Sequence, residues 1–228
     1  MPLAVAIALS YVVGSIPSAY LAGRSQGIDL RQHGSGNLGA TNVFRVLGAK
    51  IGLAVFAFDV AKGALPVLFL PRWASASLAP IYVGILCGVA AIAGHTRPVF
   101  LRFGRGGKGV ATATGVFLAL APVQALLTLA VFAVVLLTSG YVSLGSLIGA
   151  VMLPVLLAVT RSVRSPLFLI SVLVAAFVFW THRANIGRLR RGEEHRFGKR
   201  ASPARRSAAV LAIGVIVVLA VLVAARFG

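Results

Sequence analysis

The chain has 228 residues, of which 59% are hydrophobic and 11% are charged, whereas charged residues make up about 25% of a typical soluble domain. This composition excludes a soluble globular domain and indicates an integral membrane protein with room for roughly seven or eight spans of about 20 residues each. The net charge of +18 does not indicate nucleic-acid binding, because 17 of the 22 Lys and Arg residues lie in three short blocks between apolar segments.

Apolar runs cover approximately residues 3–23, 51–70, 78–93, 110–138, 141–160, 166–181 and 208–225. Lipid admits only structures that satisfy their backbone hydrogen bonds internally, and these runs are too long and uniform for barrel strands, so the predicted fold is all-α. No cation precedes Arg24, so the first run is interpreted as a retained span rather than a cleaved signal peptide. The single cysteine, Cys87, lies inside an apolar run and excludes a disulfide framework.

The three basic blocks are Arg24–Lys50, Gly94–Gly109 and His182–Arg206. The positive-inside rule predicts that all three are cytoplasmic and that the N-terminus is outside. An even number of crossings must then separate the second and third blocks, although three apolar runs lie between them. Pro122 falls near the middle of the long run 110–138, and a proline tends to break a helix. Splitting this run gives seven helices before the third block and one C-terminal helix after it; alternatively, one run lies on the membrane without crossing.

Polar residues inside the spans are few. Asp59 and Lys62 are spaced i, i+3 in the second run, which predicts an ion pair on one helix face, either as a structural link or as part of a functional site. Ser15, Pro17 and Ser18 near the end of the first run are interpreted as packing and kink residues.

The first basic block contains the sequence G-S-G-N-L-G-A-T-N at residues 34–42, followed by Arg45. Its G-x-G-x-x-G pattern does not indicate a dinucleotide-binding fold, because a loop between two spans cannot hold a strand–helix–strand unit. Glycine amides, hydroxyl groups and a helix start can still hold an anion, and Arg45 could bind phosphate through two hydrogen bonds. The alternative is a flexible glycine turn.

The second block ends in G-G-K-G at residues 106–109 but is not a P-loop, which would need Gly at Arg102 and Ser or Thr at Gly109. Lys108 among glycines before a helix start predicts a phosphate-binding loop; the alternative is a solvated topogenic charge cluster. In the third block, His182 and Asn185 share one face if the preceding helix continues. A positive-inside anchor explains the arginines of this block but not these two residues.

No metal or other cofactor is expected, because the four histidines have no His or Cys partner at short ligand spacing and acids are scarce. An acyl-enzyme through Cys87 is not expected either, since this residue lies deep in a span. The H-x4-D signature of soluble-type glycerolipid acyltransferases is missing from the chain.

Taken together, the motifs resemble those of the bacterial acyl-phosphate:glycerol-3-phosphate acyltransferases. The resemblance covers roughly residues 10–197 and rests on G-S-G-N-x-G-A-T-N at 34–42, D-x-x-K-G at 59–63, G-H at 94–95, G-G-K-G-V-A at 106–111, Y-x-S-x-G-S at 141–146 and H-R-x-N-I-x-R-L-x-x-G-x-E at 182–194. It implies a seven-helix core with cytoplasmic motifs. It also implies transfer of a fatty acyl group from acyl phosphate to the 1-hydroxyl of glycerol 3-phosphate, which gives lysophosphatidic acid and phosphate.

The resemblance also implies the site residues. Those expected to take part in catalysis are Ser35, His182 and Asn185, and those expected to bind substrate are Gly36, Asn37, Thr41, Asn42, Arg45, His95, Gly107, Lys108, Ser143 and Ser146. Arg45 and Lys108 would balance phosphate charge, Ser35 and loop amides would donate hydrogen bonds to the phosphate and the oxyanion, and His182 and Asn185 would orient the glycerol hydroxyl. The proton would pass to His182 or to a phosphate oxygen. The three blocks would then line one phosphate pocket.

The expected organisation is an acyltransferase transmembrane domain at residues 1–200 and an extension at 201–228 that carries an additional transmembrane helix. The expected location is the bacterial inner membrane. Expected partners are acyl phosphate, glycerol 3-phosphate, membrane lipid and an enzyme that forms acyl phosphate, but no nucleic acid. Two other functions stay open: a transporter of an organic phosphate, and a scaffold that binds anionic lipid through its basic loops.

Overall fold

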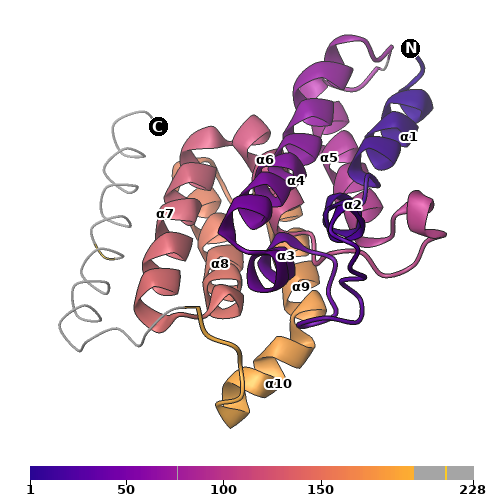
Figure 1. Cartoon of the computed structure of the whole chain (residues 1–228). Coiled ribbons are helices and arrows are strands. Elements are labelled where there is room, and N and C mark those ends of the chain that lie inside the picture. Colours follow the sequence, from indigo (N-terminus) through magenta and orange to yellow (C-terminus); the bar gives the residue numbers. More distant parts are fainter. Residues whose placement is uncertain (76, 198–213, 215–228) are drawn as a thin grey trace. The chain divides into compact units, whose positions relative to one another are not determined.

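The computed structural model describes residues 1–75, 77–197 and 214. The chain divides into two compact units, Met1–Leu120 and Ala121–Gly228, and its named elements are helices throughout the described residues (Figure 1). The additional helix expected at 208–225 and the boundary expected at residue 200 lie outside the described residues, apart from Gly214. They stay predictions.

The first unit begins with a broken span. Its elements are α1 (Leu3–Gly14), α2 (Ser18–Ser25), α3 (Ala40–Leu47), α4 (Ala49–Phe69), η1 (Leu70–Arg72), α5 (Pro80–Thr96), η2 (Val99–Leu101) and α6 (Val110–Leu120). The break between α1 and α2 falls at Pro17, which confirms the predicted kink. Helix α3 was not predicted, because it lies within the first basic block. A left-handed glycine, Gly48 with φ of 88°, separates it from α4.

Backbone-to-backbone contacts hold the helices of this unit together. A Cβ atom on Gly63 of α4 would lie 2.1 Å from the Thr112 carbonyl oxygen of α6, and one on Gly115 of α6 would lie 1.9 Å from the Val60 carbonyl oxygen of α4. Glycines at such positions let two membrane helices approach closely enough for dispersion contacts to replace the hydrophobic effect. Helices α4 and α6 therefore pack as a pair along these two glycines.

The second unit contains α7 (Pro122–Ser139), α8 (Val142–Thr160), α9 (Pro166–Thr181) and α10 (Arg183–Arg191). The helices α7 and α9 begin with proline, whose missing N–H leaves no unsatisfied donor at that position. Gly140, with φ of 75°, ends α7 in the left-handed conformation typical of helix C-termini. The apolar run 110–138 is divided at Pro122 as predicted, since α6 ends at Leu120 and α7 begins at Pro122, with only Ala121 between them.

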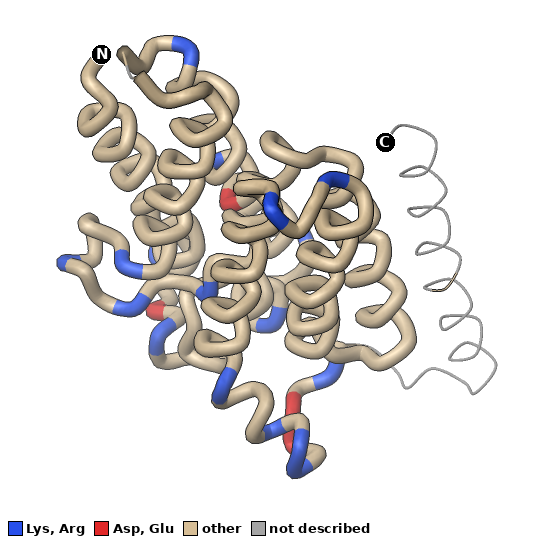
Figure 2. The backbone as a smooth tube through the Cα atoms, turned by 180° about the vertical axis from the view of Figure 1, so that it is seen from behind, with Lys and Arg blue, Asp and Glu red and all other residues tan. Residues whose placement is uncertain are grey.

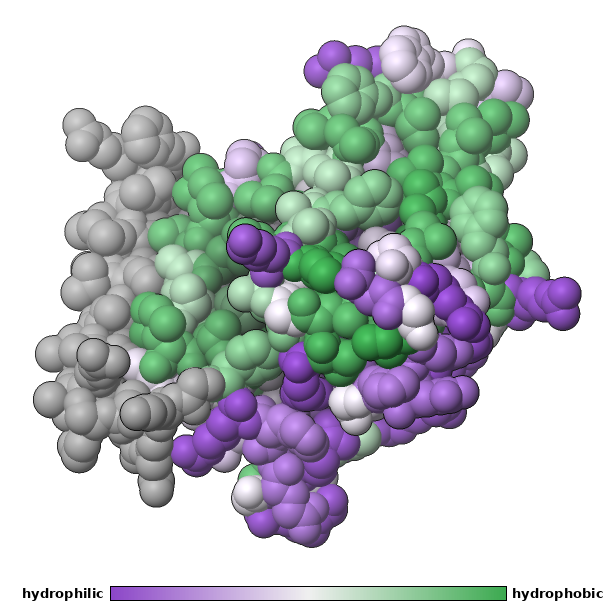
Figure 3. All heavy atoms as spheres, in the orientation of Figure 1, coloured by the Kyte–Doolittle hydropathy of each residue, from purple (hydrophilic) through white to green (hydrophobic). Residues whose placement is uncertain are grey.

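The lengths of the helices fit a multi-pass membrane protein. Five segments are long and apolar enough to cross: Leu3–Ser25, Ala49–Arg72, Pro80–Leu101, Pro122–Ser139 and Val142–Thr160. Their outward side chains are apolar, as Figure 3 shows over α1 and α4. Helix α6 has 11 residues and is thus about 16 Å long, well short of a hydrocarbon core of about 30 Å. The predicted count of seven crossings before the third block and one after it therefore stays a prediction.

Helices α9 and α10 are bent by 59° rather than continuous, so the condition under which His182 and Asn185 would share one helix face is not met. Three donors converge on the carbonyl oxygen of Val178: the Thr181 hydroxyl at 3.0 Å, the His182 backbone N–H at 3.0 Å and the His182 Nδ1 at 2.8 Å. Side chains that insert into the ladder of helical hydrogen bonds are a common cause of kinks. The bend is therefore produced by the polar pair at residues 181–182.

Most basic residues of the first unit gather at the end of its helices remote from the N-terminus, while one lies in the turn beside the N-terminus (Figure 2). The N-terminal ammonium group itself donates a hydrogen bond to the Trp73 carbonyl at 2.6 Å, beside the turn that follows η1. The first two basic blocks thus share one end of this unit, which is the arrangement that the positive-inside rule predicts for loops on one side of a membrane.

The close contact between α4 and α6 predicts that one added methyl group will strongly destabilise the fold. We expect Gly115→Ala to lower the free energy of unfolding by about 1–3 kcal/mol or more, because a carbonyl 1.9 Å from the new Cβ must move. Thermal unfolding of the detergent-solubilised protein measures this loss. The control is Gly149→Ala in α8, where the nearest atom is Thr128 Cγ2 at an ordinary 3.4 Å; equal effects at both positions would contradict the packing argument.

Candidate functional site

A single buried amide organises the loop of the first basic block. The Asn42 side chain, 1% exposed, accepts a hydrogen bond from the Ser35 backbone N–H at 2.8 Å and donates to the carbonyls of Leu30 at 3.2 Å and His33 at 3.0 Å. The loop passes so close that a Cβ on Gly34 would lie 2.3 Å from the Asn42 oxygen. Asn42 therefore holds the loop that presents Ser35, and these three bonds use both of its amide atoms.

The loops of the first two basic blocks touch each other. The Asn37 amide donates to the Gly106 carbonyl at 3.5 Å, and a Cβ on Gly107 would lie 3.0 Å from the Leu38 carbonyl oxygen. Gly106 and Gly107 also donate backbone hydrogen bonds to the last turn of α5, to the carbonyls of Thr96 at 3.0 Å and His95 at 3.3 Å. The structure thus brings the two glycine-rich segments together within the first unit.

The candidate anion-binding groups lie around this junction. Thr41 and Arg45 are four residues apart on α3 and so share one face of the helix. Both are partly exposed, as is Lys108, while Ser35 and Gly36 are exposed. These side chains are thus accessible from outside, while the loop behind them is held by the hydrogen bonds of Asn42. Guanidinium, ammonium, hydroxyl and backbone N–H groups together can hold a phosphate.

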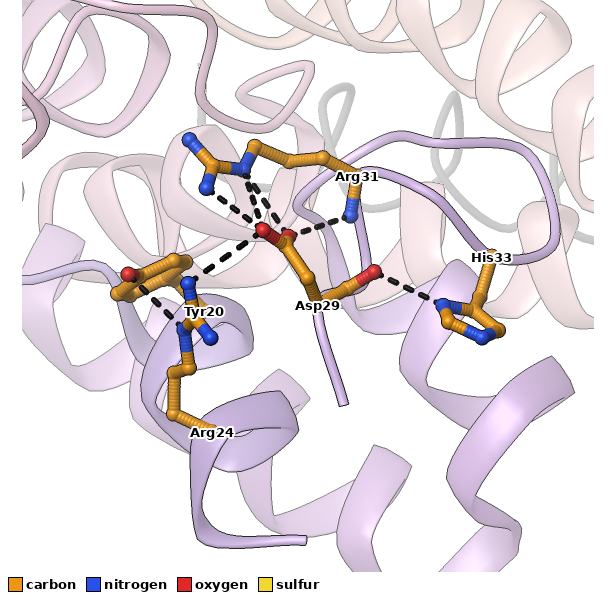
Figure 4. Close-up of polar contacts among 5 residues, drawn as sticks. All are labelled: Tyr20, Arg24, Asp29, Arg31 and His33. Atoms are coloured by element: carbon orange, nitrogen blue, oxygen red, sulfur yellow. Dashed lines mark hydrogen bonds and ion pairs between the residues drawn. The ribbon is translucent and has the colours of Figure 1, made fainter. Parts of the chain in front are cut away.

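Asp29, the acidic residue of the first basic block, does not neutralise the positive charge of these anion-binding groups. Figure 4 shows the Asp29 carboxylate facing Arg31 and Arg24 beside Tyr20, with Arg31 Nη2 at 2.6 Å and Arg24 Nη2 at 3.5 Å. Both guanidinium groups also lie over the Tyr20 ring, about 5 Å from its centroid. The Arg31 hydrogen bonds hold the pKa of Asp29 well below its usual range. The carboxylate stays ionised and is balanced locally.

A buried ion pair lies beneath the loops. Lys62 Nζ is 2.7 Å from Asp59 Oδ1, and both side chains are almost fully buried, which confirms the predicted pair. The pair reaches the break in the first span, where Lys62 donates to the Ile16 carbonyl at 2.8 Å and Ser18 donates to Asp59 at 2.6 Å. This network links α4 to both sides of the kink at Pro17.

His95 lies between that ion pair and the glycine loop. Its Nδ1 is 3.6 Å from Asp59 Oδ1, and a Cβ on Gly107 would lie 2.1 Å from its Nε2. The ring is 5% exposed. The His95 ring fills the space that any side chain at residue 107 would need, so residue 107 must be glycine. The ring also supports the glycine loop from beneath. A direct contact of His95 with substrate stays a prediction.

In the second unit the carboxylate of Glu194 accepts hydrogen bonds from three side chains. Glu194 Oε1 accepts from the Asn185 amide at 2.6 Å and from the Ser143 hydroxyl at 3.0 Å, and Oε2 accepts from Arg188 Nε at 2.7 Å. Burial alone would raise the pKa of Glu194, but these hydrogen bonds and the Arg188 charge outweigh it and lower the pKa. The structure thus brings together Ser143 of α8 and Asn185 of α10 through a residue that was not predicted as part of the site.

His182 and Ser146 are also buried in this unit. Since a carbonyl can only accept, the bond from His182 Nδ1 to Val178 places a proton on Nδ1. The Ser146 hydroxyl donates to the Val142 carbonyl of its own helix at 2.9 Å. The joining of this third block with the first two in one pocket stays a prediction.

Comparison with known proteins gives a consistent family. A family profile described as "Glycerol-3-phosphate acyltransferase" matches residues 4–192. A protein of Geobacter sulfurreducens named glycerol-3-phosphate acyltransferase is 44% identical over 197 residues, which cover 83% of this chain and 95% of that protein. One of the same name from Trichlorobacter lovleyi is 46% identical over 191 residues, covering 84% and 95%.

Solved structures agree. The crystal structure of PlsY (YgiH), an integral membrane glycerol 3-phosphate acyltransferase, in its glycerol 3-phosphate form is similar with a TM-score of 0.79 and 38% identity, covering 86% of this chain and 96% of that one. Its lysophosphatidic acid form has a TM-score of 0.77 and 37% identity, covering 86% and 95%.

The role of Asn42 can be tested by comparing two asparagines of one loop. We expect Asn42→Ala to lower the free energy of unfolding by about 2–3 kcal/mol, because it leaves three loop groups without their partner. We expect Asn37→Ala, which removes one contact at 3.5 Å, to change it by less than about 1 kcal/mol. Chemical unfolding measures both, and equal losses would contradict a special role for Asn42.

Glu194 predicts a pH-dependent difference between the wild type and Glu194→Gln. Because its pKa is lowered in the folded protein, ionised Glu194 stabilises the fold above the ordinary glutamate pKa of about 4.3, and this contribution is lost as the pH falls through the lowered value. The Tm of the variant should therefore lie below that of the wild type at pH 7, and the gap should shrink as the pH falls below about 4.3. A gap that is independent of pH would contradict the assignment.

Proposed function

Because the chain belongs to the glycerol-3-phosphate acyltransferase family, we propose that it transfers a fatty acyl group from acyl phosphate to the 1-hydroxyl of glycerol 3-phosphate. The products are lysophosphatidic acid and inorganic phosphate. The observation that carries this proposal is the junction of the first two basic blocks, where Asn37 and Gly107 join two cationic glycine loops. Both substrates and both products are anionic, so a site rich in cations and backbone donors suits them.

In the proposed reaction the glycerol hydroxyl oxygen attacks the acyl carbonyl carbon, and the bond from that carbon to the phosphate oxygen breaks. The hydroxyl proton passes to His182 or to an oxygen of the leaving phosphate. Phosphate is a good leaving group, so no covalent acyl-enzyme is required. Arg45 and Lys108 would balance the phosphate charges, while Ser35 and the amides of its loop, including those of Gly36 and Asn37, would donate hydrogen bonds to developing negative charge.

The third basic block would position the acyl acceptor, glycerol 3-phosphate. His182, whose Nδ1 is bonded to the Val178 carbonyl, would orient the glycerol hydroxyl together with the Asn185 amide. Ser143 shares the Glu194 carboxylate with Asn185, which supports a role close to substrate. Thr41, Asn42, His95, Gly107 and Ser146 would complete the site, with Asn42 and His95 also holding its loops.

We propose that the protein lies in the bacterial inner membrane with its N-terminus outside and its basic loops in the cytoplasm. The gathering of cations at one end of the first unit supports this orientation (Figure 2). The acyl phosphate would then come from a cytoplasmic or peripheral enzyme that forms it, and the acyl chain would enter from the bilayer.

The test supplies purified protein with palmitoyl phosphate and labelled glycerol 3-phosphate, and then repeats the assay with palmitoyl-CoA. We expect lysophosphatidic acid from the phosphate donor. Its absence with the wild type would overturn the proposed activity, and product from palmitoyl-CoA alone would overturn the proposed donor.

We expect Arg45→Ala to lose about 1.5–3 kcal/mol of phosphate binding, which corresponds to a roughly 10- to 150-fold higher KM for glycerol 3-phosphate. The matched control is Arg72→Ala. It removes the same charge from an exposed residue in η1, far along the chain from the glycine loops, and should leave KM unchanged. An unchanged KM in Arg45→Ala would remove the assignment of this residue.

A further inference from the structure

The segment Arg97–Arg105, which joins α5 to the glycine loop, presents two aromatic rings and three guanidinium groups to its surroundings. Phe100 is 58% and Phe103 59% exposed, and Arg97, Arg102 and Arg105 are exposed as well. Figure 1 shows this magenta loop projecting sideways from the first unit. We call it the arginine–phenylalanine loop.

The loop has a defined backbone although its side chains are exposed. Pro98 is buried at its base, and its carbonyl accepts from Leu101 N–H at 3.1 Å and from Phe103 N–H at 3.0 Å. Leu101 packs against the buried cluster that contains Leu30 and Val43. One side of the loop is therefore anchored in the protein, while both phenylalanines are exposed.

Two consecutive residues at the tip have an unusual backbone conformation. Arg102 and Phe103 have φ values of 52° and 59°, in the left-handed region that residues other than glycine rarely adopt. Such conformations persist only where the surrounding structure enforces them, and they are concentrated at sites that contact ligands or partners. The conformation is held here by the Gly104 N–H, which donates to the Leu101 carbonyl at 2.9 Å.

The position along the chain places the loop at the membrane boundary. The apolar segment Pro80–Leu101 ends within it, and the 17 residues of α5 extend about 26 Å, nearly the thickness of the hydrocarbon core. Interfacial segments insert Phe side chains at the boundary between headgroups and acyl chains, and arginines next to it attract anionic headgroups.

We propose that the arginine–phenylalanine loop docks on anionic phospholipid headgroups, with Phe100 and Phe103 at the boundary between headgroups and acyl chains and the three arginines against lipid phosphates. The sequence has no Asp or Glu between Asp59 and Glu193, and among the described residues the three guanidinium groups form no ion pair. The charge is therefore available to an anionic surface. This docking goes beyond the proposed reaction and does not depend on it.

Docking would also fix the position at which the glycine loop begins. The Gly106 N–H closes the arginine–phenylalanine loop by donating to the Thr96 carbonyl at 3.0 Å, and Gly107 follows directly. A lipid-bound segment would thus end at the residues proposed to hold phosphate.

The test measures how deep the loop lies in vesicles. A nitroxide on Phe103→Cys is compared with one on Gln32→Cys, an exposed position in the first basic block; the native Cys87 is buried and serves as the unlabelled background. Collisions with oxygen and with a water-soluble nickel chelate are recorded in dioleoylphosphatidylcholine vesicles and in an equal mixture with dioleoylphosphatidylglycerol.

We expect the label at residue 103 to favour oxygen over the chelate relative to residue 32, and to lie deeper in the anionic vesicles. Adding Arg97→Gln, Arg102→Gln and Arg105→Gln should abolish the increase caused by anionic lipid. A label as accessible to the chelate as that at residue 32, or a depth that does not respond to anionic lipid, would overturn the proposal. An unchanged Tm shows that each labelled variant is folded, so loss of docking is distinguishable from misfolding.

Discussion

The rest of the first unit depends on how the chain satisfies its backbone at the break in the first span. A helix interrupted within a membrane leaves carbonyl groups without partners, and lipid offers no water to satisfy them. Lys62 donates to the Ile16 carbonyl, and Asp59 balances the lysine charge while accepting from Ser18. An ion pair in this position does more than offset its own desolvation, because it allows the chain to turn at Pro17 and to begin the loop that carries Ser35. Through His95, the same pair lies next to the other glycine loop.

All four acids of the chain form an ion pair with an arginine or lysine. Asp29 pairs with Arg31 and Arg24, Asp59 with Lys62, Glu193 with Arg191 and Glu194 with Arg188. An unpaired carboxylate near the glycine loops would repel phosphate and compete for its cations. Because each carboxylate is neutralised by its own cationic partner, the remaining cations produce a positive electrostatic potential. This potential attracts an anionic ligand.

The sequence predicts local features well and long-range ones poorly. Apolar runs indicate the helices, and Pro17 and Pro122 indicate the breaks, because these signals act over a few residues. The Asp59–Lys62 pair is predictable for the same reason, since i, i+3 spacing places both side chains on one helix face. Helix α3 was missed because its polar and glycine-rich surroundings hide an eight-residue amphipathic segment.

The bend at His182 has neither glycine nor proline to indicate it, because it arises from side-chain bonds to one carbonyl. Glu194 was missed as a site residue because its partner Ser143 is 51 positions away, although its rarity in so basic a chain was a usable signal. Past this carboxylate the chain is held twice more, by Arg196 Nε on the Tyr141 hydroxyl at 2.6 Å and by the Phe197 N–H on the Gly140 carbonyl at 2.7 Å. These two bonds fix residues 196 and 197 to the start of α8. A force applied to the C-terminus, for example by a fused reporter or a surface tether, would therefore act on the start of α8 before it reached Asn185.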